Sequence, residues 1–150
     1  MSIDKDIKQT KFKSEYQKAV INLVFTYNWT IEKLKVFFEK GDLTMQQFNI
    51  LRILRGSHQP LSTLQIRDRM LDKMSDTSRI VDRLLVKGLV KKVVCKTDKR
   101  LVDITITAKG KKVLEKLDVH EKEMDNIVNQ LSLDEAKKLN RLLDKIRSSK

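Results

Sequence analysis

The scarcity of turn-forming residues constrains this fold more than any other feature of the sequence. The 150 residues include four glycines and one proline, too few to connect the many short strands of a β-sandwich or barrel. From Tyr16 to Phe38 the apolar residues recur in alternating steps of four and three, as one face of a long helix requires. We therefore expect one mostly helical chain with a packed core.

Capping patterns mark where three further helices begin. A Ser or Thr followed three residues later by Gln or Glu can satisfy two free backbone N–H groups at a helix start. This pattern occurs at Thr44 with Gln47, at Ser62 with Gln65 and at Ser132 with Glu135. It predicts a helix over 43–54, a short helix through Met70 and a last helix through Ile146. Thr107 and Gly110 lead into another helix, which the apolar spacing extends to Val128.

Residues 75–106 combine an amphipathic helix with the strongest strand pattern in the chain. Ser75 or Asp76 can cap a helix that ends near Gly88. At 100° per residue, one arc of this helix carries Thr77, Ile80, Val81, Leu84, Leu85 and Gly88, and we expect it to be buried. The other arc carries Ser75, Asp76, Ser78, Arg79, Asp82, Arg83 and Lys87. After Gly88, β-branched runs flank the polar tip 96–100 and predict a β-hairpin.

The positive charge is concentrated in the same region. The chain carries 32 Lys and Arg against 20 Asp and Glu, a formal net charge of +12, and residues 79–100 hold eight basic and two acidic side chains. Half of the surplus therefore falls on the helix and the hairpin. Clustered basic residues favour a nucleic-acid partner because they neutralise phosphates. An anionic membrane surface and a merely solvated basic face are the alternatives.

Two short helices, an amphipathic helix and a basic hairpin, in this order, are typical of a winged helix-turn-helix. Such a helix fits the DNA major groove, where the guanidinium of Arg79 can match guanine O6 and N7. Short side chains before it would let the helix approach closely. We expect Lys96 to contact phosphate, and Lys99 and Arg100 at the hairpin tip to reach the adjacent minor groove.

Several segments resemble the multiple antibiotic resistance regulator (MarR) family of bacterial transcription factors. One segment is Leu43-Thr44-x-x-Gln47-Phe48-x-x-Leu51, and a second is Ser78-Arg79-Ile80-Val81-Asp82-Arg83-Leu84 with Lys87-Gly88-Leu89-Val90. The others are Asp98-Lys99-Arg100 and Ile104-Thr105-Ile106-Thr107-x-x-Gly110. Together they span residues 43–110 in the family's order.

The resemblance implies a homodimer that binds a pseudo-palindromic operator. Residues 12–40 and 111–148 would form the dimerisation helices, and residues 43–109 the winged helix-turn-helix lobe. By the same resemblance, Ser75, Asp76, Thr77, Ser78 and Arg79 lie in or beside the major groove. Arg100 enters the minor groove, braced by Asp98. Thr77 is a partial exception, because it falls on the buried arc. Arg83 either contacts phosphate or is simply a neighbour of Arg79 one turn away.

Other candidate sites are weaker. Cys95, the single cysteine, fits a packed strand residue better than a redox sensor, since the sensing cysteines of some family members lie near the N-terminus. His58 and His120 are too few for a zinc site. Neither a Ser-His-Asp order nor a Gly-rich phosphate loop supports an enzyme. We therefore expect no catalytic activity, metal or cofactor.

We predict a cytoplasmic, dimeric transcription regulator, most simply a repressor, that binds double-stranded DNA and no membrane. No stretch approaches a membrane span, and no secretory signal core occurs in residues 1–13. The resemblance also suggests a pocket for a small aromatic effector between the dimer helices and the DNA-binding lobe. The alternatives are an architectural DNA-binding protein that reads no sequence and a basic helical protein that binds membranes or acidic partners.

Overall fold

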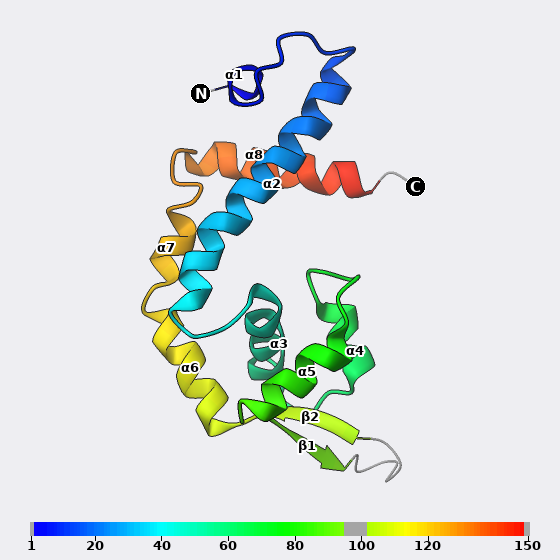
Figure 1. The fold of residues 1–150 in the computed structure, drawn as a ribbon, viewed down its shortest axis with the longest axis vertical. Coiled ribbons are helices and arrows are strands. Elements are labelled where there is room, and N and C mark those ends of the chain that lie inside the picture. Colours follow the sequence, from blue (N-terminus) through cyan, green and yellow to red (C-terminus); the bar gives the residue numbers. More distant parts are fainter. Residues whose placement is uncertain (1, 95–101, 149–150) are drawn as a thin grey trace.

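The computed structural model describes residues 2–94 and 102–148 and is mostly helical, with one antiparallel hairpin (Figure 1). The helices are α1 (Ile3–Asp6), α2 (Glu15–Glu39), α3 (Met45–Arg55), α4 (Thr63–Arg69), α5 (Thr77–Val86), α6 (Ala108–Asp118), α7 (Glu121–Asp125) and α8 (Leu133–Arg147). The strands are β1 (Val90–Val94) and β2 (Val102–Ile106). This confirms the predicted fold class, a mostly α protein with a winged helix-turn-helix lobe.

The capping residues begin the helices as the sequence predicts. Full capping boxes open α3 at Thr44, α4 at Ser62 and α8 at Ser132. For α5 the cap is Asp76, not Ser75, because the Asp76 carboxylate accepts a hydrogen bond from the Arg79 N–H at 3.1 Å. Past the end of α5, Gly88 adopts a φ of 69°, a left-handed conformation that glycine reaches without steric cost.

The core of the molecule lies in the lobe built from α3, α4, α5, the hairpin and α6. Its largest fully buried side chains are Ile50, Leu51, Leu61, Ile66, Leu84, Ile104, Leu114 and Leu117. Leu61 also exchanges two backbone hydrogen bonds with Ile104, at 3.0 and 2.7 Å. The segment before α4 is thereby attached to the edge of β2, and the lobe forms one packed unit.

An aromatic cluster joins the end of α2 to this lobe. The rings of Phe37 and Phe38 pack at 5.3 Å between centroids, and both contact the ring of Phe48 on α3, at 5.8 and 4.9 Å. The two pairs made by Phe37 are edge-to-face and the Phe38–Phe48 pair is tilted, and such aromatic pairs add to the stabilisation from buried area. The C-terminal end of α2 is therefore part of the lobe's core.

The helix that we predicted from Thr107 through Val128 is in fact broken. Helix α6 ends at Asp118 and α7 begins at Glu121, and the His120 N–H bonds to the Leu117 carbonyl only three residues earlier. Contacts with other elements lie on either side of the break. Asp118 forms a two-point ion pair with Arg55 at 2.7 and 3.1 Å, and beyond the break Glu123 pairs with Lys40. The apolar spacing continues across the break and did not indicate it.

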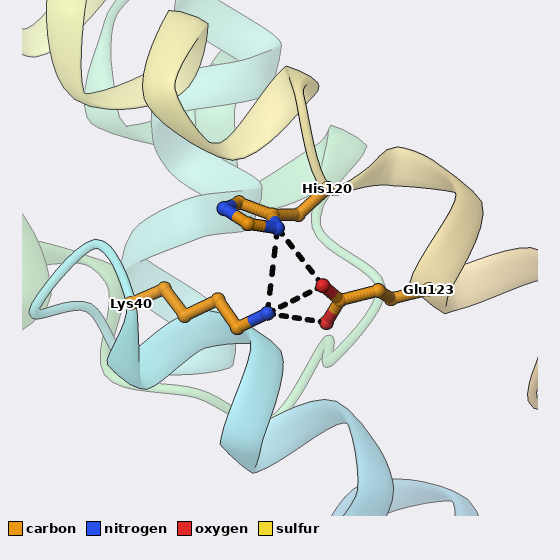
Figure 2. A network of polar contacts seen from close by, with 3 residues as sticks. All are labelled: Lys40, His120 and Glu123. Carbon is orange, nitrogen blue, oxygen red and sulfur yellow. Dashed lines mark hydrogen bonds and ion pairs between the residues drawn. The ribbon is translucent and has the colours of Figure 1, made fainter.

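Figure 2 shows the second of these contacts. The Lys40 Nζ lies 2.5 Å from the Glu123 carboxylate, and the His120 Nδ1 lies 2.8 Å from the same carboxylate. These interactions hold the pKa of Glu123 below its ordinary value, the Lys40 hydrogen bond most strongly and the His120 bond next. The network links the end of α2 to α7.

The elements outside the lobe leave much apolar surface uncovered. Helix α8 lies at the opposite end of the molecule from the hairpin (Figure 1), and none of its residues is buried. Leu139, Leu142 and Ile146 form an exposed stripe along it. On α2 the predicted apolar face is buried at Phe38 but exposed at Tyr16, Val20 and Tyr27.

Candidate nucleic-acid interface

Helix α5 buries one side and exposes the other. Val81 and Leu84 are 2% and 0% exposed, whereas Ser78, Arg79, Asp82 and Arg83 are exposed. The predicted sorting is thus confirmed at Thr77, Val81 and Leu84 and at Asp76, Ser78, Arg79, Asp82 and Arg83. Ile80 and Leu85 of the predicted buried arc and Ser75 and Lys87 of the predicted exposed arc are half-buried, and Gly88 is exposed. A polar helix face with two arginines and short neighbouring side chains can approach a grooved, anionic surface closely.

The short residues at the start of α5 make different contacts. The Ser75 hydroxyl donates to the Asp72 carbonyl at 2.8 Å, and Asp76 caps the helix. Thr77 is 3% exposed, and its hydroxyl has no partner among the described residues. The structure therefore presents Ser78 and Arg79 outward but turns the Thr77 side chain toward the interior, where it cannot contact a ligand on the exposed face.

The cations around α5 fall into two groups. Within the described part of the chain, neither Arg79 nor Arg83 has an acidic partner within 4 Å. Arg83 follows Asp82 in the sequence, but the two side chains form no ion pair. By contrast, the Lys92 Nζ lies 3.6 Å from Asp82, and Lys87 is also paired with a carboxylate. The two arginines thus remain available to an external anion.

Lys87 connects the end of α5 to the segment between α2 and α3. Its Nζ lies 2.9 Å from the Asp42 carboxylate and also bonds to the Asp42 carbonyl. The hydrogen bond from Lys87 lowers the pKa of the Asp42 carboxyl. Both residues line a cavity of about 540 Å³, whose apolar walls include Tyr27, Ile31 and Phe38.

The expected contacts of the wing lie outside the described residues. Lys96, Asp98, Lys99 and Arg100 belong to this group, as does Cys95. Strands β1 and β2 pair from Val90 with Ile106 to Val94 with Val102, so the hairpin itself is confirmed. The roles of its tip residues stay predictions.

Two polar residues that position α5 were not recognised in the sequence. The Asn49 Oδ1 accepts a hydrogen bond from the Leu71 N–H at 2.9 Å, and the Asp72 Oδ1 accepts one from the Met74 N–H at 3.0 Å. Asp72 stands where an aspartate commonly organises a turn. Asn49 is an amide within the run Phe48-Asn49-Ile50-Leu51 of α3, and a polar residue among these apolar neighbours was the available signal.

The described residues contain no group of three or more His, Cys, Asp and Glu side chains that could hold a metal ion. His120 instead faces Glu123 and Lys40 (Figure 2). None of the described helices has the length and apolar character needed to cross a bilayer.

Comparison with known proteins identifies the relatives of this chain. Residues 43–102 match the model of the MarR family. The crystal structure of a MarR transcription factor from Planctomyces limnophilus is 32% identical, covers 89% of this chain and 98% of its own, and superposes with a TM-score of 0.66. The chain belongs to the MarR family. Its fold is thus that of a MarR-family transcription regulator, as the sequence resemblance implied.

Two further proteins are similar to this chain. An uncharacterised helix-turn-helix transcriptional regulator of Bacillus subtilis, YfiV, is 32% identical over 74 residues. That match spans 49% of this chain and 46% of the relative, so it covers about half of each protein. BpsR of Bordetella bronchiseptica, whose DNA binding is regulated by 6-hydroxynicotinic acid, has the same fold, with a TM-score of 0.79 over 94% of this chain and 100% of its own at 20% identity.

Proposed function

We propose that this MarR-family protein is a homodimeric transcription repressor that binds a pseudo-palindromic operator in the cytoplasm and is released by a small aromatic effector. The exposed face of α5 is the observation that carries the proposal. It offers Arg79 and Arg83, which have no acidic partner among the described residues, on a helix whose other side is fixed by Val81 and Leu84. Such a helix can enter a major groove without losing core contacts.

The residues at the start of the recognition helix, α5, and Arg83 farther along it have distinct proposed roles. Arg79 reads a base edge, because its planar fork matches guanine O6 and N7. Ser75 and Ser78 allow close approach, Asp76 holds the helix start, and Arg83 contacts phosphate. Thr77 supports the helix from its buried side. Lys96, Lys99 and Arg100 of the wing contact phosphates and the minor groove, with Asp98 as their brace.

The exposed apolar surface of α2 and α8 supports the proposal that this protein forms a dimer. The face of α2 that is buried at Phe38 continues, exposed, through Tyr27, Val20 and Tyr16, and α8 adds the stripe ending at Ile146. Large apolar patches of this kind mark interaction sites. A second copy covering them would place two α5 helices on one DNA molecule, about 34 Å apart for successive major grooves.

The cavity beside Lys87 supports the proposal that a small effector binds this protein. Its volume of about 540 Å³ suits a small molecule, and the rings of Tyr27 and Phe38 line it. Because the cavity adjoins both α2 and the end of α5, a ligand could favour one spacing of the two lobes over another. A change in spacing would weaken both half-sites at once.

Selection from a pool of random duplexes tests the proposal. The wild-type protein should enrich a palindrome and bind it far more tightly than a scrambled duplex of equal length at the same salt concentration. Equal affinities for the two duplexes would overturn the proposal and favour an architectural DNA-binding protein. Binding to anionic vesicles but to neither duplex would instead favour the basic interaction protein.

A further inference from the structure

We propose that Asn49 is a positioning residue for DNA recognition: through its hydrogen bond to Leu71 it sets where the recognition helix begins. The proposal rests on the function proposed above, since it concerns how α5 is presented to DNA. Asn49 itself lies on α3, is 8% exposed and cannot reach a ligand on the surface.

The hydrogen bond falls at the point where the chain leaves α4. Helix α4 ends at Arg69, and Met70 turns to an extended conformation with its side chain buried. The next N–H, that of Leu71, donates to the Asn49 Oδ1 at 2.9 Å. The Leu71 side chain is 76% exposed, so it contributes little packing. The amide of Asn49 therefore ties the backbone of the turn to α3 at a residue whose side chain is not anchored.

From Leu71 the chain reaches α5 through a short series of local bonds. Asp72 accepts from the Met74 N–H and from the Ser75 hydroxyl, and Asp76 caps the helix. These bonds fix the shape of the turn, but they join only residues within it and the first turn of α5. The Lys73 Nζ also bonds back to the Asp68 carbonyl of α4. Among the described residues, the bond that Asn49 accepts is the side-chain hydrogen bond that ties this turn to α3.

Loss of this bond should affect sequence reading more than phosphate contact. Base contacts require the helix to lie in one register, whereas long basic side chains can follow phosphates over some distance. A turn released from α3 would let the start of α5 shift while its hydrophobic side stays packed. Discrimination between duplexes is therefore the property that separates positioning from a general structural role.

The test compares three variants on the palindrome selected by the wild-type protein and on a scrambled duplex. Asn49→Leu removes the acceptor with similar volume, and Asn49→Asp keeps an acceptor oxygen at the same place. Ile50→Val, at the next and fully buried position of α3, weakens packing without touching the turn. Thermal unfolding and circular dichroism establish that each variant is folded, and Asn49→Ala replaces Asn49→Leu if the latter does not fold.

We expect the Asn49→Leu variant to lose about tenfold in affinity for the palindrome, comparable to misaligning one bidentate base contact, with little change on the scrambled duplex. Asn49→Asp should restore most of the discrimination, and Ile50→Val should leave it unchanged. In NMR hydrogen exchange, the Leu71 amide should lose protection only when the acceptor is absent.

Undiminished discrimination in the Asn49→Leu variant, or equal losses in the Asn49→Asp and Asn49→Leu variants, would overturn the inference while leaving the proposed function intact. If the wild-type protein itself bound both duplexes equally, the proposed function would fail instead.

Discussion

Lys87, at the end of α5, forms an ion pair with Asp42, in the connection between α2 and α3, with Nζ and Oδ2 2.9 Å apart. The pair joins the end of α5 to the segment that leads from α2 into α3. Because both residues also line the cavity of about 540 Å³, a molecule bound there would lie against the contact that holds the end of α5. Under the proposed function, this pair would couple effector binding to DNA binding.

Replacing Lys87 should change the titration of Asp42. The hydrogen bond from Lys87 holds the pKa of Asp42 below its ordinary value, so in the Lys87→Met variant we expect this pKa to rise toward the ordinary aspartate value. By linkage, the pair stabilises the fold at pH values above the unfolded-state pKa of Asp42, and this contribution is lost as the pH falls through the lowered pKa. NMR titration of the Asp42 carboxyl measures the shift. Lys92→Met is the matched control, since Lys92 pairs with Asp82, and an equal shift in both variants would contradict the assignment.

The network of Figure 2 makes a second pH prediction. Lys40, and to a smaller extent His120, lower the pKa of Glu123. In the Lys40→Met variant the pKa of Glu123 should rise toward the ordinary glutamate value, and in the His120→Gln variant it should rise less. The stabilisation from the network is present at pH values above the unfolded-state pKa of Glu123 and is lost as the pH falls through the lowered pKa. NMR titration of the Glu123 carboxyl in the wild-type protein and in the two variants measures these pKa values. A larger rise in the His120→Gln variant than in the Lys40→Met variant would contradict the prediction.

Removing the cap of α5 should destabilise the lobe. The Asp76→Ala variant loses the acceptor for the Arg79 N–H, and we expect the free energy of unfolding to fall by about 1 kcal/mol. Asp76→Ser keeps a capping oxygen and should recover most of this loss. Urea unfolding measures both. A drop in the Ser75→Ala variant as large as in Asp76→Ala would indicate that the cap is shared.

Two glycines should respond in opposite ways to a methyl group. A Cβ at Gly110 would lie 2.2 Å from the Leu89 carbonyl oxygen and 2.8 Å from an Ile106 side-chain carbon. The backbone cannot yield cheaply there, so Gly110→Ala should cost about 3 kcal/mol in the free energy of unfolding. At Gly56 the nearest atom is 3.5 Å away, and Gly56→Ala should be neutral or slightly stabilising. Equal Tm values for the two variants would be inconsistent with this packing.

The two kinds of DNA contact should separate in binding experiments. Arg79→Ala should lose about 1 to 3 kcal/mol on the selected palindrome and much less on a scrambled duplex. Lys96→Ala should weaken binding to both duplexes alike, as expected for a phosphate contact. Fluorescence anisotropy at fixed salt measures the four affinities. A palindrome-selective loss on removing Lys96 would mean that the wing reads sequence.

Local signals in the sequence predicted most of the fold. The three capping boxes and the left-handed Gly88 act within one turn of chain, so their residues can be identified without knowledge of distant contacts. The exposed arc of α5 was predictable for the same reason, because helical geometry alone separates Arg79 from Val81.

What the sequence did not predict depends on contacts between distant residues. The break after Asp118 lies beside an ion pair between that residue and Arg55, 63 positions away. The role of Asn49 depends on Leu71, 22 positions away. Contacts between residues this far apart produce no periodic pattern in the sequence. The apolar spacing therefore predicted a helix as far as Val128, and the role of Asn49 was not recognised.

The central claim is that a dimer of this protein reads two half-sites about one duplex turn apart. Its most direct test is the ratio of two Kd values: one for the selected palindrome, and one for the same DNA with about half a turn (~5 base pairs) inserted between the half-sites. The insertion should reduce affinity to that of a single half-site, because the second α5 then faces the wrong side of the duplex. Equal Kd values for the two DNAs would contradict it.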